Sequence, residues 1–190
     1  ENIFTPESIL YFPDSGYLFV SNIAGNSREK NQTGYLSVIS LDGSMIHERW
    51  TENLNAPKGM AIFGDRLYVA DIDKLVETDL RNGNVIKNYT IEGAMFMNDV
   101  AADDQGMIFV SDSDVGCIYV LERGQLTKWL CDEGFERPNG LWIEEKMLWV
   151  VFSGSGNMIK VDIETRKTDL FATGLGRADG IMTDGKGGWV

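Results

Sequence analysis

Short apolar segments separated by polar turns recur at a regular interval along this chain. Five of them begin alike, and they span 8–10, 59–61, 99–101, 140–142 and 180–182. Their first residues are 51, 40, 41 and 40 positions apart. A second apolar segment follows each one after a turn rich in Gly and Asp, at 18–20, 67–69, 108–110, 148–150 and 189–190. Such pairs predict β-hairpins.

Two further strands are expected in each complete repeat. In the third repeat they lie at 117–121 and 126–130, and in the fourth at 158–162 and 168–171. Four short strands in a period of about 40 residues are typical of a β-propeller blade. The sequence shows no convincing helical periodicity. We therefore predict an all-β fold and a single propeller domain over residues 1–190.

Four repeats are complete, and the chain ends at Val190 inside the second strand of a fifth. An open arc of blades would expose strand edges and apolar faces. We expect these residues to cover about four and a half blades of a closed, six-bladed propeller, without the rest of blade five and blade six. The first repeat is longer because of a polar insertion at 26–33. We expect a loop on one rim there, and nothing in the insertion marks chemistry.

Composition excludes some classes of partner. The net charge of −12 argues against a nucleic acid or an anionic membrane. No apolar run approaches the roughly 20 residues that cross a bilayer. We expect a monomer that binds a small-molecule substrate. The sequence begins with Glu1 and not with an initiator methionine. A removed signal peptide would explain this and would make the protein secreted or periplasmic. A trimmed N-terminus would explain it equally well and leaves a cytoplasmic protein open.

Cysteine and histidine are scarce. Cys117 and Cys131 flank the turn at 123–124 nearly symmetrically. A cross-strand disulfide is conceivable, but this geometry is usually strained, and we interpret both as small core or surface residues. His47 is the single histidine and lies on an expected outer strand, where we expect it to be exposed. One histidine excludes both a His-dependent triad and a His-rich zinc site.

The residue just before the first strand carries a side-chain oxygen in four of the five repeats. These residues are Glu7, Asn98, Asn139 and Asp179. In a fold that arranges repeats around an axis, equivalent positions converge on one point. Four oxygens with two negative charges suit one hard divalent cation, calcium first, or zinc, manganese or magnesium. The pattern therefore predicts a metal site.

These positions also have an explanation without a metal. Asn and Asp before Gly are common turn residues, which covers Asn139 and Asp179. Glu7 has little turn preference, and the common phase of all four favours the metal site. Lys58 takes the equivalent place in the second repeat. We interpret it either as a solvated lysine on the rim or as a residue that holds an anionic group of a substrate.

The motifs around these positions resemble those of a known family. They read Pro6-Glu7-Ser8-Ile9, Asn98-Asp99-Val100, Pro138-Asn139-Gly140-Leu141 and Ala178-Asp179-Gly180-Ile181. They are similar to the senescence marker protein / gluconolactonase / luciferin-regenerating enzyme family, which includes regucalcin, and to diisopropylfluorophosphatase. The resemblance runs from the first repeat to the fifth. It implies a six-bladed propeller in which a Glu, two Asn and an Asp hold a central divalent cation.

The chain departs from that family in three places. Ser8 and Ile9 follow the glutamate where the family usually has Gly and Pro, and Val100 stands where sugar-lactone enzymes tend to have Gly. Phe96 stands where some gluconolactonases have a substrate-binding arginine. With Met95 and Met97 beside it, it predicts a more apolar pocket mouth and casts doubt on a sugar-acid lactone. Ordinary packing between blades is the alternative.

We therefore expect a metal-dependent hydrolase of a lactone or similar activated ester, in which the cation polarises the carbonyl. Asp179 is the expected general base or nucleophile. Asp99 is a secondary acid/base candidate, although it should point to the opposite face of its strand from Asn98. Lys58, Phe96 and Met97 are expected to contact the substrate.

Two other classes of function stay open. The first is a non-catalytic propeller that binds a small molecule, sugar or peptide around a structural calcium ion. The second is a protein-interaction scaffold, which the four oxygens disfavour.

Overall fold

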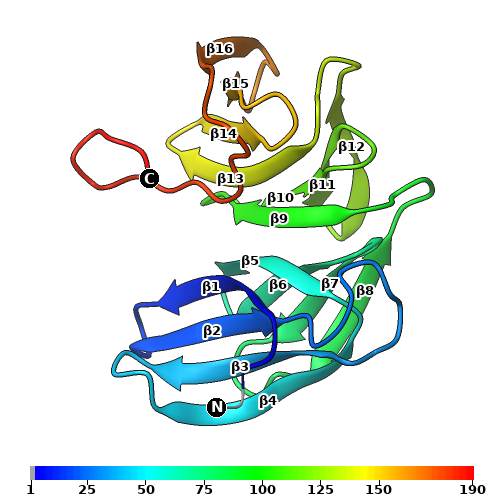
Figure 1. The fold of residues 1–190 in the computed structure, drawn as a ribbon, viewed down its shortest axis with the longest axis vertical. Helices are drawn as coiled ribbons and strands as arrows, with labels where there is room; N and C mark the ends of the chain where they lie inside the picture. Colours follow the sequence, from blue (N-terminus) through cyan, green and yellow to red (C-terminus); the bar gives the residue numbers. More distant parts are fainter. Residues whose placement is uncertain (1–2) are drawn as a thin grey trace. The chain divides into compact units, whose positions relative to one another are not determined.

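The described part of the chain consists of antiparallel strands and the turns and loops between them (Figure 1). The computed structural model describes residues 3–190, so Glu1 and the question of a signal peptide lie outside the described residues. In that range the strands are β1 (Pro6–Phe12), β2 (Tyr17–Asn22), β3 (Gly34–Ser40), β4 (Met45–Leu54), β5 (Pro57–Phe63), β6 (Arg66–Asp71), β7 (Lys74–Asp79), β8 (Val85–Thr90), β9 (Met97–Ala102), β10 (Ile108–Asp112), β11 (Cys117–Glu122), β12 (Gln125–Cys131), β13 (Pro138–Glu144), β14 (Met147–Phe152), β15 (Met158–Asp162) and β16 (Thr168–Ala172). No helix that could span a membrane occurs among the described residues.

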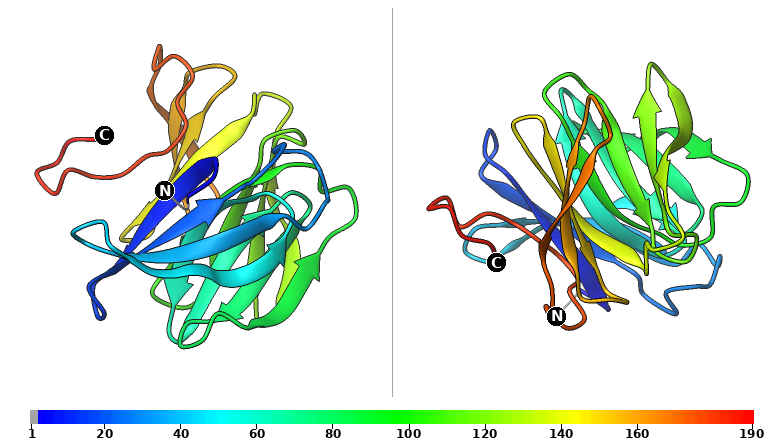
Figure 2. Two further views of the ribbon diagram at one scale, coloured as in Figure 1. Left: turned by 60° about the horizontal axis from the view of Figure 1, so that its bottom comes forward. Right: turned by 90° about the horizontal axis from the view of Figure 1, so that it is seen from above.

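Each complete repeat of the sequence is one four-stranded sheet. The sheets are β1–β4, β5–β8, β9–β12 and β13–β16, and sequence neighbours pair within each. The predicted all-β fold is confirmed, while the number of six blades stays a prediction. In the fifth repeat, the described residues form a bridge between Thr183 and Trp189, in the segment drawn in red in Figure 2.

The chain divides into two compact units, Glu1–Met97 and Asn98–Val190. The first unit contains β1–β8. Its core comes from apolar positions of β2 to β7 and consists of Phe19, Leu36, Val38, Leu54, Met60, Leu67, Val69 and Val76. Because side chains alternate across a strand, one face of each sheet supplies this core. The single domain expected from the repeats stays a prediction.

The second unit contains β9–β16 and has a core of its own. The core residues include Phe109, Ile118, Trp129, Leu141, Leu148, Val150 and Val161. The rings of Phe109 and Trp129 meet edge to face, with centroids 4.9 Å apart. Since the two sheets of this unit share one core, the starts of β9 and β13 are held in a fixed relation.

The cysteines correct one expectation and the histidine confirms another. Cys117 and Cys131 are opposite each other on β11 and β12 and form a disulfide, so our interpretation of two free residues is wrong. Their Cα atoms are 4.2 Å apart, which is the close spacing of directly opposed residues on paired strands. His47 is exposed on the outer strand β4, as predicted.

Candidate functional site

The first strand of a repeat starts with a β-bulge in the sheets of β1, β5 and β13. The register shifts by one residue between Pro6 and Ser8, and at the equivalent place in β5 and β13. The residues within these shifts include Glu7, Lys58 and Asn139. A bulge turns a side chain away from the regular alternation of the strand. The three positions therefore share both their phase in the repeat and their backbone geometry.

Asn139 and Asp179, from consecutive repeats, contact each other. Nδ2 of Asn139 donates a hydrogen bond to Oδ1 of Asp179 at 2.6 Å. Asn139 is buried and Asp179 is exposed. Gly140 permits this approach, because a Cβ there would lie 2.5 Å from the carbonyl oxygen of Asp179. Two of the predicted metal ligands are thus neighbours in the second unit.

Asn98 is tied to the same place by a serine. The hydroxyl of Ser113 donates to the carbonyl of Pro138 at 2.7 Å, so it can only accept from Asn98, whose Nδ2 lies 3.1 Å away. This fixes the orientation of the buried amide, with nitrogen toward Ser113. Among residues 3–190, no hydrogen bond uses the side-chain oxygen of Asn98.

Asp99 performs a structural task. Its Oδ1 accepts from the amide of Val100 at 2.8 Å and its Oδ2 from the amide of Leu141 at 2.7 Å, which joins β9 to β13. Burial raises the pKa of Asp99 to about 6, and the charge of Asp179 acts in the same direction. The two amide hydrogen bonds oppose the shift. Asp99 therefore lies next to the candidate ligands with both carboxylate oxygens in use.

Lys58 is not a solvated lysine on the rim, which was one of our two interpretations. It is 2% exposed. Its ammonium donates to the carbonyls of Ala56 at 2.9 Å and Ser27 at 3.4 Å. Burial lowers the pKa of Lys58, and the nearby carboxylates of Glu7 and Asp71 oppose that shift. Glu7 itself is exposed at the start of β1.

Phe96 lies under two cations. The Lys58 nitrogen is 4.4 Å from the ring centroid and the Arg28 guanidinium carbon is 4.2 Å from it. Met97 is fully buried, and its amide bonds to the carbonyl of Ile72, so it belongs to the packed interior. Met95 is 59% exposed. Of the predicted substrate contacts, Lys58 and Phe96 are brought together.

The structure divides the predicted site between the two compact units. Asn98, Asn139 and Asp179 gather in the second unit, with Asp99 beside them, while Glu7 and Lys58 lie in the first. Among the described residues, no three His, Cys, Asp or Glu side chains form a group that could hold a metal. A cation bound at the second unit would therefore depend on amide oxygens.

The donor chemistry of the second unit fits a hard cation. Nitrogen atoms of both amides are engaged, by Ser113 and by Asp179. No hydrogen bond within residues 3–190 uses the side-chain oxygen of Asn98 or Asn139. Neutral carbonyl oxygens and a carboxylate are the ligands that calcium prefers.

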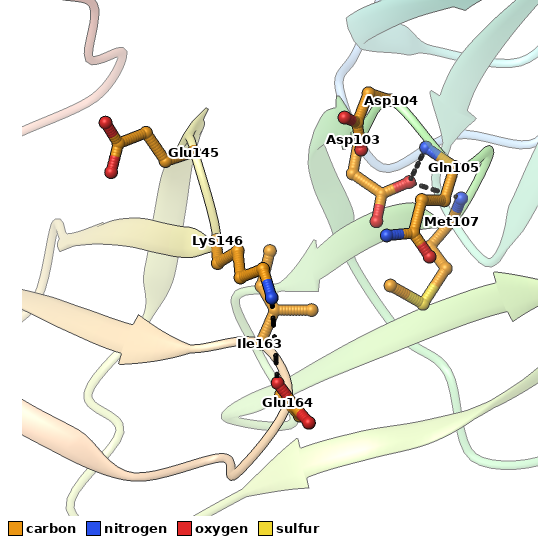
Figure 3. A pocket seen from close by; sticks show the side chains of 8 residues that line it. All are labelled: Asp103, Asp104, Gln105, Met107, Glu145, Lys146, Ile163 and Glu164. Carbon is orange, nitrogen blue, oxygen red and sulfur yellow. Dashed lines mark hydrogen bonds and ion pairs between the residues drawn. The ribbon is translucent and has the colours of Figure 1, made fainter.

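A separate pocket lies at the other end of the same strands (Figure 3). It has a volume of about 420 Å³ and is lined by Asp103, Asp104, Gln105, Met107, Glu145, Lys146, Ile163 and Glu164. These residues follow β9, β13 and β15, whereas the candidate ligands of this unit lie at the start of β9 and β13 or follow β16. None of the predicted site residues lines this pocket.

The sequence alone did not identify Ser111, Ser113 or Arg28 as residues that position the predicted site. Ser113 orients Asn98, and Ser111 accepts from the amide of Asp99 while it donates to the carbonyl of Asn139. A signal existed for Ser111, because Ser21 stands at the same phase and accepts from the amide of Ser8. Arg28 had no such signal, since it belongs to the insertion.

Solved structures of propeller proteins are similar to this chain. A catalytically inactive histidine-to-alanine variant of virginiamycin B lyase from Staphylococcus aureus, solved with quinupristin, matches with a TM-score of 0.70 and 12% identity. The match covers 93% of this chain and 59% of that one. A streptogramin B lyase matches with a TM-score of 0.66 and 12% identity over 96% of this chain and 74% of that one.

A designed protein has the same kind of fold. The computationally designed Ika8 protein matches with a TM-score of 0.63 and 11% identity, over 94% of this chain and 52% of its own. At such identities the likeness shows the fold alone. The chain spans about three fifths of the length of the virginiamycin B lyase. No protein-family model and no curated protein sequence matches it.

Proposed function

We propose that this propeller is a metal-dependent hydrolase of a lactone or similar activated ester. Asn98, Asn139 and Asp179 would hold a hard divalent cation, calcium first and zinc, manganese or magnesium as alternatives. The observation that carries the proposal is the Asn98–Ser113–Pro138 chain. It presents an amide oxygen of fixed orientation in the unit where Asn139 meets Asp179.

When bound, the cation supplies Lewis acidity that polarises a carbonyl. Asp179 is exposed and uses Oδ1 to accept from Asn139, which leaves Oδ2 to take a proton from an attacking water or to attack the carbonyl carbon. Asp99 has both oxygens committed to backbone amides. This favours Asp179 over Asp99 for the catalytic role.

The test begins with binding. Calorimetric titration of calcium into chelator-treated protein should give a saturable isotherm, and Asn98→Ala or Asp179→Ala should weaken it at least tenfold. Asp104→Ala is the matched control, because it removes an exposed carboxylate from a turn of the same unit. Thermal melting should rise with added calcium and fall with a chelator.

The second step is a panel of lactones and aryl esters with calcium, zinc, manganese and no metal. Turnover that depends on both a metal and Asp179 supports the hydrolase. Absence of a calcium isotherm together with turnover unaffected by chelator would contradict the proposal.

A non-catalytic binding module is the second candidate. The commitment of Asp99 to the backbone favours it, because one of the two expected acid/base residues is then structural. Calcium binding without turnover on the whole panel would select this function.

A further inference from the structure

The pocket of about 420 Å³ in the second unit has an apolar wall and a rim of charged side chains (Figure 3). Met107 and Ile163 form the apolar wall, and both pack against the core that the sheets β9–β12 and β13–β16 share. Because this wall belongs to a packed core, the two sheets hold it in position. The volume lies within the range of small-molecule sites, which is roughly 300–1,000 Å³.

Asp103 is the buried charge of this pocket. It is 8% exposed, and its Oδ1 accepts from the amides of Gln105 at 2.9 Å and Met107 at 2.8 Å. Among residues 3–190, no hydrogen bond or ion pair uses its Oδ2, which points into the space between the labelled side chains of Figure 3. Burying a carboxylate while one of its oxygens lacks a donor is costly, and a bound cation relieves that cost.

Three further carboxylates stand around the pocket. Asp104 follows in the same turn, Glu145 lies in the turn between β13 and β14, and Glu164 lies in the turn between β15 and β16. Within residues 3–190, Asp104 and Glu145 take part in no ion pair, and Glu164 forms one with Lys146 at 3.9 Å. The two side chains of that pair are 80% and 78% exposed, so the pair contributes little. The lining thus sets four carboxylates against one ammonium.

These carboxylates are too far apart to share one metal ion. Among the described residues, no three His, Cys, Asp or Glu side chains form a group that could hold a metal. Each of the three turns instead offers its own negative charge, and Met107 and Ile163 supply an apolar surface among them. A chain with a positive charge at each end and an apolar middle matches this arrangement.

We propose that this pocket binds a short aliphatic polyamine, of which a diamine is the simplest. One ammonium group lies against Oδ2 of Asp103, a second lies against the carboxylates of the other two turns, and the methylene chain packs on the apolar wall. An ammonium suits single carboxylate oxygens, because it is a compact charge with three donors. Lys146 already brings such a group to Glu164, and a ligand amine replaces it. The pocket shares no residue with the candidate metal site, so this inference is independent of the proposed function.

The test is calorimetry at constant ionic strength on chelator-treated protein, with putrescine as the probe and butylamine as the reference with a single charge. Asp103→Asn removes the charge but keeps an oxygen for the two amides of the turn. Asp184→Asn is the matched control, because Asp184 accepts from the amides of Lys186 at 2.7 Å and Gly188 at 2.8 Å in the equivalent turn of the fifth repeat, outside the pocket. Lys146→Met removes the competing ammonium.

The parent protein and Asp184→Asn should bind putrescine alike, and about fivefold more tightly than butylamine, because a second charge is held. Asp103→Asn should bind putrescine about tenfold more weakly. Lys146→Met should bind it about threefold more tightly, a gain that damage to the fold cannot produce. Circular dichroism verifies that each variant is folded.

The inference is overturned if putrescine binds the parent no better than butylamine, or if Asp103→Asn and Asp184→Asn weaken its binding equally. Either result would indicate attraction to the net charge of −12 and not to a site. Displacement of putrescine by an equal concentration of magnesium would overturn it as well, because a diffuse acidic surface does not distinguish two divalent cations. These outcomes are separable from a failure of the proposed function, since they need neither a bound metal nor turnover.

Discussion

The side-chain amide of Asn139 donates a 2.6 Å hydrogen bond to the carboxylate of Asp179, forty residues further along the chain. The two residues occupy the same phase of consecutive repeats, so a regularity of the sequence becomes a direct contact. The contact orients the carboxylate of Asp179 through its Oδ1 and leaves Oδ2 available.

Replacing Asp179 by Asn should abolish turnover of any ester that the protein hydrolyses. The amide keeps an oxygen for a metal but can neither accept a proton nor attack a carbonyl. The fold should survive, because the side chain is exposed. The measurement is kcat on the best substrate, alongside the melting temperature. Turnover at the parental rate would leave the binding module as the better account.

Ser113→Ala should weaken calcium binding without removing a ligand. The substitution releases the amide of Asn98 and leaves the carbonyl of Pro138 without its donor. Partners that orient metal ligands are typically worth about 10- to 100-fold in affinity, and the unfolding free energy should fall by about 1–2 kcal/mol. Ser153→Ala is the control, because Ser153 holds the equivalent place after β14 and donates only to the carbonyl of Arg137. Equal calcium affinities in both variants would show that the orientation of Asn98 is irrelevant to binding.

Asp99 should make the free energy of unfolding fall as pH rises, which is the opposite of the usual effect of an aspartate. Its pKa is raised in the folded protein, from 3.8 to about 6, so the folded state holds the proton more tightly than the unfolded state. The resulting stabilisation is present below about pH 4 and is lost as pH rises through about 6, by up to about 3 kcal/mol. Urea unfolding between pH 4 and 7 in chelator should show this fall in the parent. Asp99→Asn should remove it, and an identical pH profile in both proteins would contradict the prediction.

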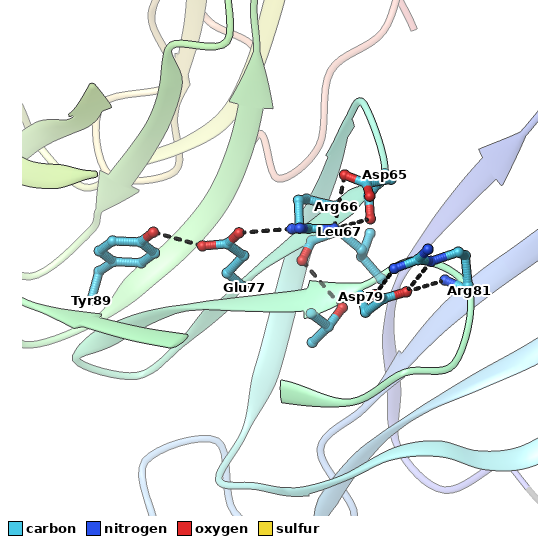
Figure 4. Close-up of polar contacts among 8 residues, drawn as sticks. Asp65, Arg66, Leu67, Glu77, Asp79, Arg81 and Tyr89 are labelled. Atoms are coloured by element: carbon cyan, nitrogen blue, oxygen red, sulfur yellow. Dashed lines mark hydrogen bonds and ion pairs between the residues drawn. The ribbon is translucent and has the colours of Figure 1, made fainter. Parts of the chain in front are cut away.

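The carboxylate of Glu77 accepts hydrogen bonds from two side chains. Removing one of these donors should lower the free energy of unfolding more than breaking a surface ion pair does. Glu77 receives a hydrogen bond from Tyr89 at 2.6 Å and one from Arg66 at 3.1 Å (Figure 4). Because Glu77 is buried, Tyr89→Phe should lower the unfolding free energy by about 1–2 kcal/mol. Arg123→Ala, which breaks the exposed pair with Glu122, should cost less than about 0.5 kcal/mol. Denaturant unfolding compares the two, and equal losses would refute the ranking.

The strands could be predicted because their signal is local. The apolar positions at 18–20 and 67–69 alternate with turns, and hairpin pairing needs no distant information. Asn139 and Asp179 could also be predicted as candidate site residues, since equal phase in a repeat implies an equal place in the fold. The burial of Lys58 could not be predicted, because it depends on an insertion more than twenty residues earlier that packs over this lysine. The disulfide was missed for a related reason. Two strands were predicted, but not the register that sets Cys117 opposite Cys131.

Gly140 limits which substitutions this part of the protein can accept. A side chain at that position would collide with the backbone at Asp179 and Gly180, so the two repeats cannot drift independently. Asn139 and Asp179 can each be exchanged by one mutation that leaves the backbone in place. Any residue other than glycine at position 140 must first push the next repeat aside. Evolution, or a protein engineer, can therefore retune the chemistry of these two side chains far more readily than the spacing between them.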